Sequence, residues 1–219
     1  MNIKIFSAKD YFNYYFAGIA WLACAFSIAI KDFSNCIAMI ETIGKIPVSI
    51  LTVLLIAIPF IVGFVLNPLG NLITFLLRKI LGDSADWVLV LSGQKFSTTK
   101  KPFQKRISEP SRTKILEKLS LLQGGSTNYS PFYFVRNYVE IKANDNARTL
   151  VNRSLDMANL TESLLIPISL FGFLIGKIFI SQIGSLIFGV LLFVLLCYRY
   201  FRLREYWVKH NYRTFLILE

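Results

Sequence analysis

Long apolar runs without ionisable side chains dominate the hydrophobic pattern of the chain. The clearest run, Ile46 to Leu66, holds 21 residues and no charged or titratable one. At about 1.5 Å of rise per helical residue, such a run can cross a hydrocarbon core of about 30 Å. A helix satisfies its own backbone hydrogen bonds there. The run therefore predicts a transmembrane helix, and Pro59 and Gly63 within it are compatible with one because membrane helices tolerate both residue types.

Further apolar runs cover Tyr11 to Ile30, Leu164 to Ile180 and Ile183 to Tyr198. The first carries several aromatic residues at its start, as membrane interfaces often do. The last two are separated by Ser181 and Gln182 alone, which predicts a helical hairpin, with one broken or re-entrant element as the alternative. We therefore expect an all-α polytopic membrane protein with four transmembrane helices.

The alternation of apolar and polar stretches divides the chain into four predicted segments: 1–77 with the lead and the first two spans, 78–163 as a basic helical cytosolic domain, 164–198 as the hairpin, and 199–219 as a cytosolic C-terminal helix. The second span is expected to continue to Arg78, with a kink at Pro68. In the basic domain, Lys95 to Arg112 is interpreted as a loop.

Apolar spacing predicts three helices in the basic domain. One is capped by Ser111 and another starts at Ser130-Pro131, because Ser is a preferred cap and Pro a preferred first-turn residue. Their expected buried faces are Ile115, Leu116, Leu119 and Leu122, and Phe132, Val135, Tyr138 and Val139, respectively. The third runs from Ala147 into the third span, since no breaker precedes Pro167.

The last segment also has a helical pattern. Phe201, Val208 and Phe215 recur every seven residues, and Glu205 stands four residues before Lys209, a favourable order for an ion pair. We expect this helix to extend from the fourth span and to pack on the basic domain.

Charge sets the expected orientation. The chain has 24 Lys and Arg against 13 Asp and Glu, a net charge of +11. With the predicted spans, almost all basic residues fall on the side of both termini, and Lys31, Lys45 and Lys177 fall on the other. The positive-inside rule then places both termini in the cytosol. We expect a multi-pass protein of the cell inner membrane, in contact with membrane lipids.

The basic domain offers a candidate site for phosphate groups. Its candidate ligand-binding residues are Lys100, Lys101, Lys105, Arg106, Arg112, Arg136, Arg148 and Arg153. Clustered Lys and Arg side chains bind phosphates of lipids, nucleotides or oligonucleotides. The alternative interpretation is that these residues bind no ligand. They would then belong to a solvated or lipid-facing basic loop and to the ordinary surface of helices.

Polar residues form a stripe along the second span. Asn67, Asn71, Thr74 and Arg78 are spaced to lie on one helix face. This stripe is the candidate pore lining, because polar faces of membrane helices line water-filled paths. The alternative interpretation is hydrogen bonding between helices, which membrane proteins use routinely.

Catalytic motifs are missing. The sequence has no GxxxxGK[ST], GxGxxG, HExxH or GxSxG pattern, and its sole histidine, His210, has no cysteine or serine nearby in sequence. The three cysteines show no metal-binding spacing. Asp and Glu are missing from all four predicted spans, which disfavours proton-coupled transport. We expect no enzyme activity, no cofactor and no metal site.

The overall layout resembles a group of small bacterial membrane effectors. Short spans, a basic helical insert between the second and third, and the terminal helix YRYFRLREYWVKHNYRTFL resemble membrane components of anti-phage defence systems of the Hailong and Kiwa type. The resemblance implies a homo-oligomer, with a tetramer favoured, whose spans form an ion pore. It also implies a cytosolic domain that senses a nucleotide signal or a phage factor. A short oligonucleotide ligand or a partner defence protein is a further expected partner.

Two functions therefore follow from the sequence. The first is an oligomeric, ligand-gated ion pore. The second is a non-conducting membrane anchor or scaffold that recruits a partner protein or nucleic acid through its basic domain. A small transporter is disfavoured by the absence of acidic residues from the predicted spans.

Overall fold

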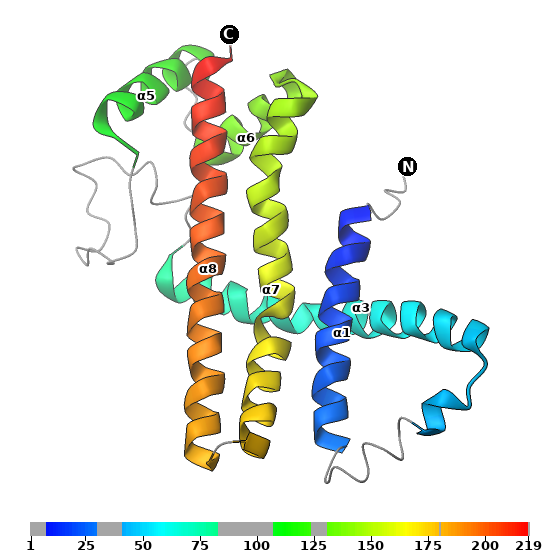
Figure 1. Cartoon of the computed structure of the whole chain (residues 1–219). Helices are drawn as coiled ribbons and strands as arrows, with labels where there is room; N and C mark the ends of the chain where they lie inside the picture. Colours follow the sequence, from blue (N-terminus) through cyan, green and yellow to red (C-terminus); the bar gives the residue numbers. More distant parts are fainter. Residues whose placement is uncertain (1–7, 30–40, 83–106, 124–130, 180, 219) are drawn as a thin grey trace. The chain divides into compact units, whose positions relative to one another are not determined.

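The computed structural model describes residues 8–29, 41–82, 107–123, 131–179 and 181–218. Within these ranges the labelled elements are all helices, and no strand occurs. The helices are α1 (Ala8–Ala29), α3 (Val48–Leu81), α5 (Glu109–Gln123), α6 (Pro131–Lys142), α7 (Asp145–Phe179) and α8 (Gln182–Ile217) (Figure 1). The all-α class is therefore confirmed for the described part of the chain.

Among the residues that the structure describes, three helices are long and apolar enough to cross a membrane: α3, α7 as far as Lys177, and α8. Helix α3 covers the predicted second span and continues through Pro68, as expected. It ends at Leu81, and the next residue, Gly82, has a positive φ of 86° that suits glycine and an N–H that donates to the carbonyl of Arg78 at 2.8 Å. Helix α1 occupies the first predicted span, but a fourth crossing and the orientation of the chain remain predictions.

The chain divides into two compact units. Unit 1 comprises Met1–Phe75 and Asn159–Tyr200, and unit 2 comprises Leu76–Ala158 and Phe201–Glu219. Helices α3, α7 and α8 contribute residues to both units.

In unit 1, small residues let α1 approach α3 closely. A Cβ atom on Gly18 would collide with the carbonyl of Pro59, and one on Gly63 would collide with the carbonyl of Tyr14. The ring of Tyr14 packs edge-on against Phe64 at 5.4 Å beside this contact. Membrane helices associate largely through such close packing, since lipid supplies no hydrophobic driving force between them.

Unit 1 also contains the predicted hairpin. Helices α7 and α8 are separate elements that lie side by side (Figure 1). A Cβ on Gly176 would come within 2.8 Å of the Cβ of Ser185, and one on Gly189 within 2.9 Å of the Cβ of Phe173. The two helices therefore pack through small residues on both sides, which agrees with a hairpin and not with one merged element.

Unit 2 has its own hydrophobic core, to which α5, α6, α7 and α8 all contribute. The ring of Phe132 packs edge-on against Trp207 at 5.0 Å, and the ring of Tyr138 against Phe215 at 5.3 Å. The buried cluster is Ile115, Leu119, Phe132, Val135, Val139, Ala143, Val151, Trp207, Val208, Tyr212 and Phe215. The C-terminal helix thus packs on the helices of the basic domain, as its apolar spacing predicted.

The start of α5 corrects one prediction. Glu109 and Pro110 are already helical, so Ser111 lies inside the helix and residues 109–112 are not part of a loop. The N–H of Arg112 donates to the carbonyl of Ser108 at 3.0 Å. A proline suits the first turn because its missing N–H would be unpaired there anyway, so the helix begins ahead of the serine that the sequence favoured as its cap.

Two further local contacts involve side chains: a hydrogen bond at the start of α7 and a set of ion pairs within α8. Asn144 accepts a hydrogen bond from the N–H of Ala147 at 2.9 Å, so α7 begins before the predicted Ala147. The predicted ion pair of Glu205 with Lys209 is present at 2.5 Å, and Arg202 also contacts Glu205, at 3.1 Å. Glu205 is buried, so these two cations compensate a carboxylate that lies out of water.

A substitution at the contact of α1 with α3 tests the packing in unit 1. We expect Gly63→Ala to destabilise the protein by about 1–3 kcal/mol, because the added methyl group meets backbone atoms that cannot move away as a side chain would. Gly44→Ala is the matched control, since a Cβ there meets no atom within 4 Å. Thermal unfolding of the detergent-solubilised protein measures both, and equal melting temperatures would contradict the close contact.

Candidate functional site

The predicted pore stripe lies along α3 with unequal exposure. Thr74 is fully buried, Asn67 and Arg78 are half-buried, and Asn71 is exposed. The stripe is therefore not a uniformly accessible polar face in the single chain.

Hydrogen bonds within unit 1 engage two members of the stripe. The hydroxyl of Thr74 donates to the carboxylate of Glu162, and the hydroxyl of Ser163 donates to the side-chain oxygen of Asn67 at 2.6 Å. Between them, Gly70 lets the backbones meet, since a Cβ there would come within 2.5 Å of the Glu162 carbonyl. These contacts favour the interpretation of Asn67 and Thr74 as groups that join α3 to α7.

Glu162 is a residue that sequence reasoning missed. The third span was predicted to begin at Leu164, which placed this carboxyl outside the membrane-spanning set. In the structure α7 is continuous from Asp145 and Glu162 is buried against α3. The sequence did contain a signal for this. No helix breaker lies between Ala147 and Pro167, so the buried face of the helix can begin before the uninterrupted run of apolar residues does.

The predicted phosphate-binding residues separate into three groups. Lys100, Lys101, Lys105 and Arg106 lie outside the described residues. Arg112 is buried in α5. Arg136, Arg148 and Arg153 belong to α6 and α7, where Arg153 is exposed.

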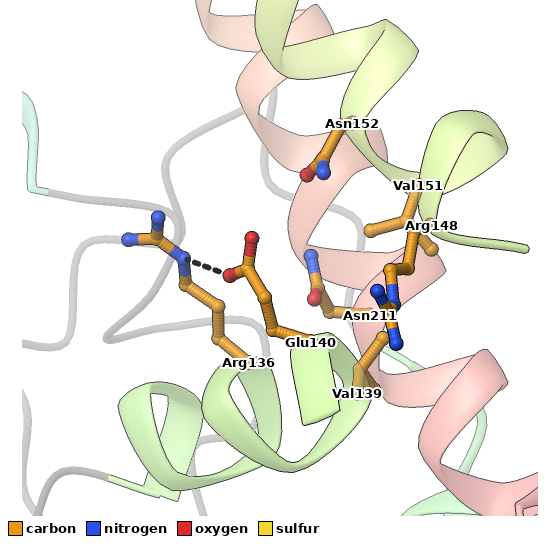
Figure 2. Close-up of a pocket in the computed structure, with 7 residues that line it drawn as sticks. All are labelled: Arg136, Val139, Glu140, Arg148, Val151, Asn152 and Asn211. Carbon is orange, nitrogen blue, oxygen red and sulfur yellow. Dashed lines mark ion pairs between the residues drawn. The ribbon is translucent and has the colours of Figure 1, made fainter. Parts of the chain in front are cut away.

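Two of these arginines line one pocket in unit 2. Figure 2 shows Arg136 and Glu140 on α6, Arg148 on α7, and Asn211 on α8 around it. The pocket is half open to solvent, and its enclosed space is about that of one water molecule. The remaining lining residues are Val139, Val151 and Asn152. The helical fold thus joins two candidate residues that are twelve positions apart in sequence.

Acidic side chains partly balance the arginines of this pocket. The Nε atom of Arg136 lies 3.7 Å from a carboxylate oxygen of Glu140, and Arg148 lies 3.5 Å from Asp145. All four side chains are substantially exposed, so water screens both pairs. Each guanidinium has five N–H donors, more than one exposed ion pair occupies. The site can therefore bind a small anion if these weak pairs rearrange.

The wall of the pocket contains a residue of the C-terminal helix that sequence analysis did not assign to it. Asn211 is buried, and its amide nitrogen donates to the backbone carbonyl of Trp207 at 2.9 Å. The density of Arg and aromatic residues in this helix was the available signal, but its seven-residue apolar repeat indicated packing only.

A substitution at Thr74 tests the hydrogen bond with Glu162. We expect Thr74→Val to lower the free energy of unfolding by about 1–3 kcal/mol, because a buried carboxylate then loses a donor. Thr52→Val is the matched control, since Thr52 is exposed and its hydroxyl bonds only to the carbonyl of Val48 in its own helix. Thermal unfolding in detergent compares the two, and equal losses would show that the Glu162 contact adds no stability.

Comparison of the chain with models of known families, with curated proteins and with solved structures finds no match. The resemblance to membrane effectors of defence systems therefore remains a prediction from the layout of the chain.

Proposed function

We propose that this chain is a membrane-anchored binding protein whose helical unit 2 recognises a phosphate-bearing ligand or partner. The observation that carries the proposal is that Arg136 and Arg148 both line one pocket, in a chain whose described part has three helices of membrane-spanning length. In this proposal both termini and unit 2 are cytosolic, in agreement with the distribution of basic residues.

The pocket supports a small anionic group as the recognised feature. Its enclosed space is close to that of one water molecule, so the pocket does not surround a larger ligand. Arginine binds phosphate through two parallel N–H bonds, and two arginines from different helices supply such bonds from two directions. In this proposal the phosphate group lies at the open side of the pocket, and the rest of a nucleotide or partner lies farther out.

The contacts of the polar stripe support the anchor over the pore as the role of the spans. Asn67 and Thr74 are used in hydrogen bonds to Ser163 and Glu162. In the alternative in which they line a path for ions, these bonds would have to be exchanged for water when the path opens.

Binding measurements on arginine variants test this proposal. The purified full-length protein in nanodiscs of neutral lipid is titrated with pyrophosphate and with ATP by calorimetry. We expect Arg136→Gln to weaken binding by at least about tenfold, because a charge-assisted hydrogen bond is worth about 1.5–3 kcal/mol. Arg153→Gln is the matched control, since Arg153 is exposed and is not among the pocket residues. Equal losses in both variants, or no binding to the wild-type protein, would overturn the proposal.

A second candidate function is an oligomeric ion pore gated by the same ligand, as in anti-phage defence effectors. The observation that favours it is the exposure of Asn71 on α3, a helix whose apolar part is mostly exposed in the single chain. A polar amide on such a helix gains from a hydrogen bond to a second copy or from a water-filled path. Copies arranged about an axis, such as a tetramer, would bring one such helix from each chain together.

Single-channel recording in planar bilayers tests the pore. We expect discrete currents that pyrophosphate or ATP switches, and an altered conductance in Asn71→Leu and Arg78→Ala. Leu72→Ala is the control, because this neighbouring side chain is exposed but apolar. A silent bilayer under all conditions would exclude the pore and leave the anchor.

A further inference from the structure

An open groove runs along the helical hairpin of unit 1, between α7 and α8. Its volume is about 180 Å³. For comparison, an apolar cavity of about 150 Å³ inside a protein holds a benzene molecule. The groove is lined by residues of both helices: Ser169 and Phe173 of α7, and Leu186, Gly189, Val190 and Phe193 of α8. It therefore has room for a short length of hydrocarbon.

A glycine shapes this groove. The four lining residues of α8 are spaced by three, one and three positions, so they share one helix face. Gly189 lies where the two helices come closest, since a Cβ atom on it would come within 2.9 Å of the Cβ of Phe173. Because it has no side chain, Gly189 leaves a depression between Leu186 and Phe193 on this face.

The lining is chemically apolar. Its one polar side chain is Ser169, whose hydroxyl donates to the carbonyl of Leu165 in the same helix at 2.7 Å. Leu186 and Val190 at the rim are 56% and 54% exposed. Since the serine donor is already used within α7, the groove suits hydrocarbon rather than a polar ligand.

The groove has the depth of one membrane leaflet. Leu186 and Phe193 follow the start of α8 at Gln182 by four and eleven residues. At about 1.5 Å per residue they lie about 6 and 16 Å along the helix, and half of a hydrocarbon core of roughly 30 Å is about 15 Å. An α-helix of a second copy is about 10–12 Å wide, too wide to enter a groove of this volume, whereas a single acyl chain is not.

A lysine stands at the end of the groove nearest the turn between the helices. Lys177 is exposed in the last turn of α7, four residues after Phe173, and so on the same helix face. Gly176 beside it packs on Ser185, which places Lys177 level with the start of α8. Lysines at the end of a span extend to the membrane surface, where they attract anionic headgroups.

We propose that the groove between α7 and α8 holds one acyl chain of an anionic phospholipid, whose headgroup lies beside the ammonium group of Lys177. Lipid surrounds every exposed apolar face of a span, but a groove lets one chain contact two helices at once, and these added dispersion contacts retain it. The inference goes beyond the proposed function and does not involve the arginine pocket of unit 2.

Filling the groove with a larger side chain tests the chain-binding part. The purified full-length protein is placed in vesicles of phosphatidylcholine and phosphatidylglycerol that carry a photoactivatable group on the acyl chain. We expect Val190→Phe to lower crosslinking to the lining residues about tenfold, because about ten carbon contacts to the lipid are lost. Val194→Phe is the matched control, since Val194 is 55% exposed on the same helix and does not line the groove. Equal crosslinking in both variants would overturn the inference.

The crosslinking pattern of the wild-type protein keeps the test valid if Val190→Phe folds poorly. Peptide mass spectrometry locates the crosslinked residues. We expect them to concentrate on the groove lining over apolar residues of α3 such as Val53 and Val65, which are at least as exposed as Val190. An even distribution, as ordinary surrounding lipid gives, would contradict a specific site. A groove covered by a second copy would leave its lining without crosslinks and would also overturn the inference.

The headgroup is tested at the lysine. Native mass spectrometry compares how much phosphatidylglycerol and phosphatidylcholine the solubilised protein retains. We expect Lys177→Gln to lower the preference for phosphatidylglycerol about fivefold, the effect of one lysine near a membrane surface. Lys45→Gln is the control, because Lys45 is also exposed in unit 1 but precedes α3. An unchanged preference in Lys177→Gln would overturn the anionic headgroup. None of these outcomes alters pyrophosphate binding by unit 2, so this inference and the proposed function fail separately.

Discussion

A membrane helix can expose only groups that lipid accepts, so every polar side chain on such a helix needs a partner within the protein or access to water. In unit 1 this constraint is met where Gly70 admits the backbone of α7. The close approach lets the Thr74 hydroxyl reach Glu162 and the Ser163 hydroxyl reach Asn67. A carboxyl is thereby held between apolar helices, and two of the four residues of the polar stripe on α3, Asn67 and Thr74, become part of the packing.

Unit 2 depends on a different balance, between aromatic packing and positive charge. Phe132, Trp207 and Phe215 bury large rings where α6 meets α8, and basic side chains lie over two of these rings. Such contacts hold cations at the edge of an apolar core without an acidic partner for each. The arginine pocket lies at the margin of this core, since its lining includes Val139 and Val151 of the buried cluster.

Sequence patterns predicted the elements better than their limits or their contacts. The helix through Pro68, the buried positions of α6 and the packing of the C-terminal helix all follow from apolar periodicity. The start of α5 was predicted too late because a preferred cap, Ser111, competes with a proline that serves equally well in the first turn. Glu162 was placed outside the spans because an acidic residue interrupts a run of apolar residues. A hydrogen-bond partner on another helix, here Thr74, can nevertheless stabilise a buried carboxylate.

The sequence by itself determined that this chain is helical and suited to a membrane, because the length of a charge-free run and the period of its apolar residues are local properties. It also supplied the arginines that the candidate site requires. Only the tertiary structure decided which of them share a site: Arg136 and Arg148 line one pocket, whereas Arg153 is exposed and does not line it. It alone placed Arg136 of α6 over the ring of Trp207 on α8. The reason is physical, since convergence on one site depends on how helices pack against each other, and no periodicity within a single helix encodes that.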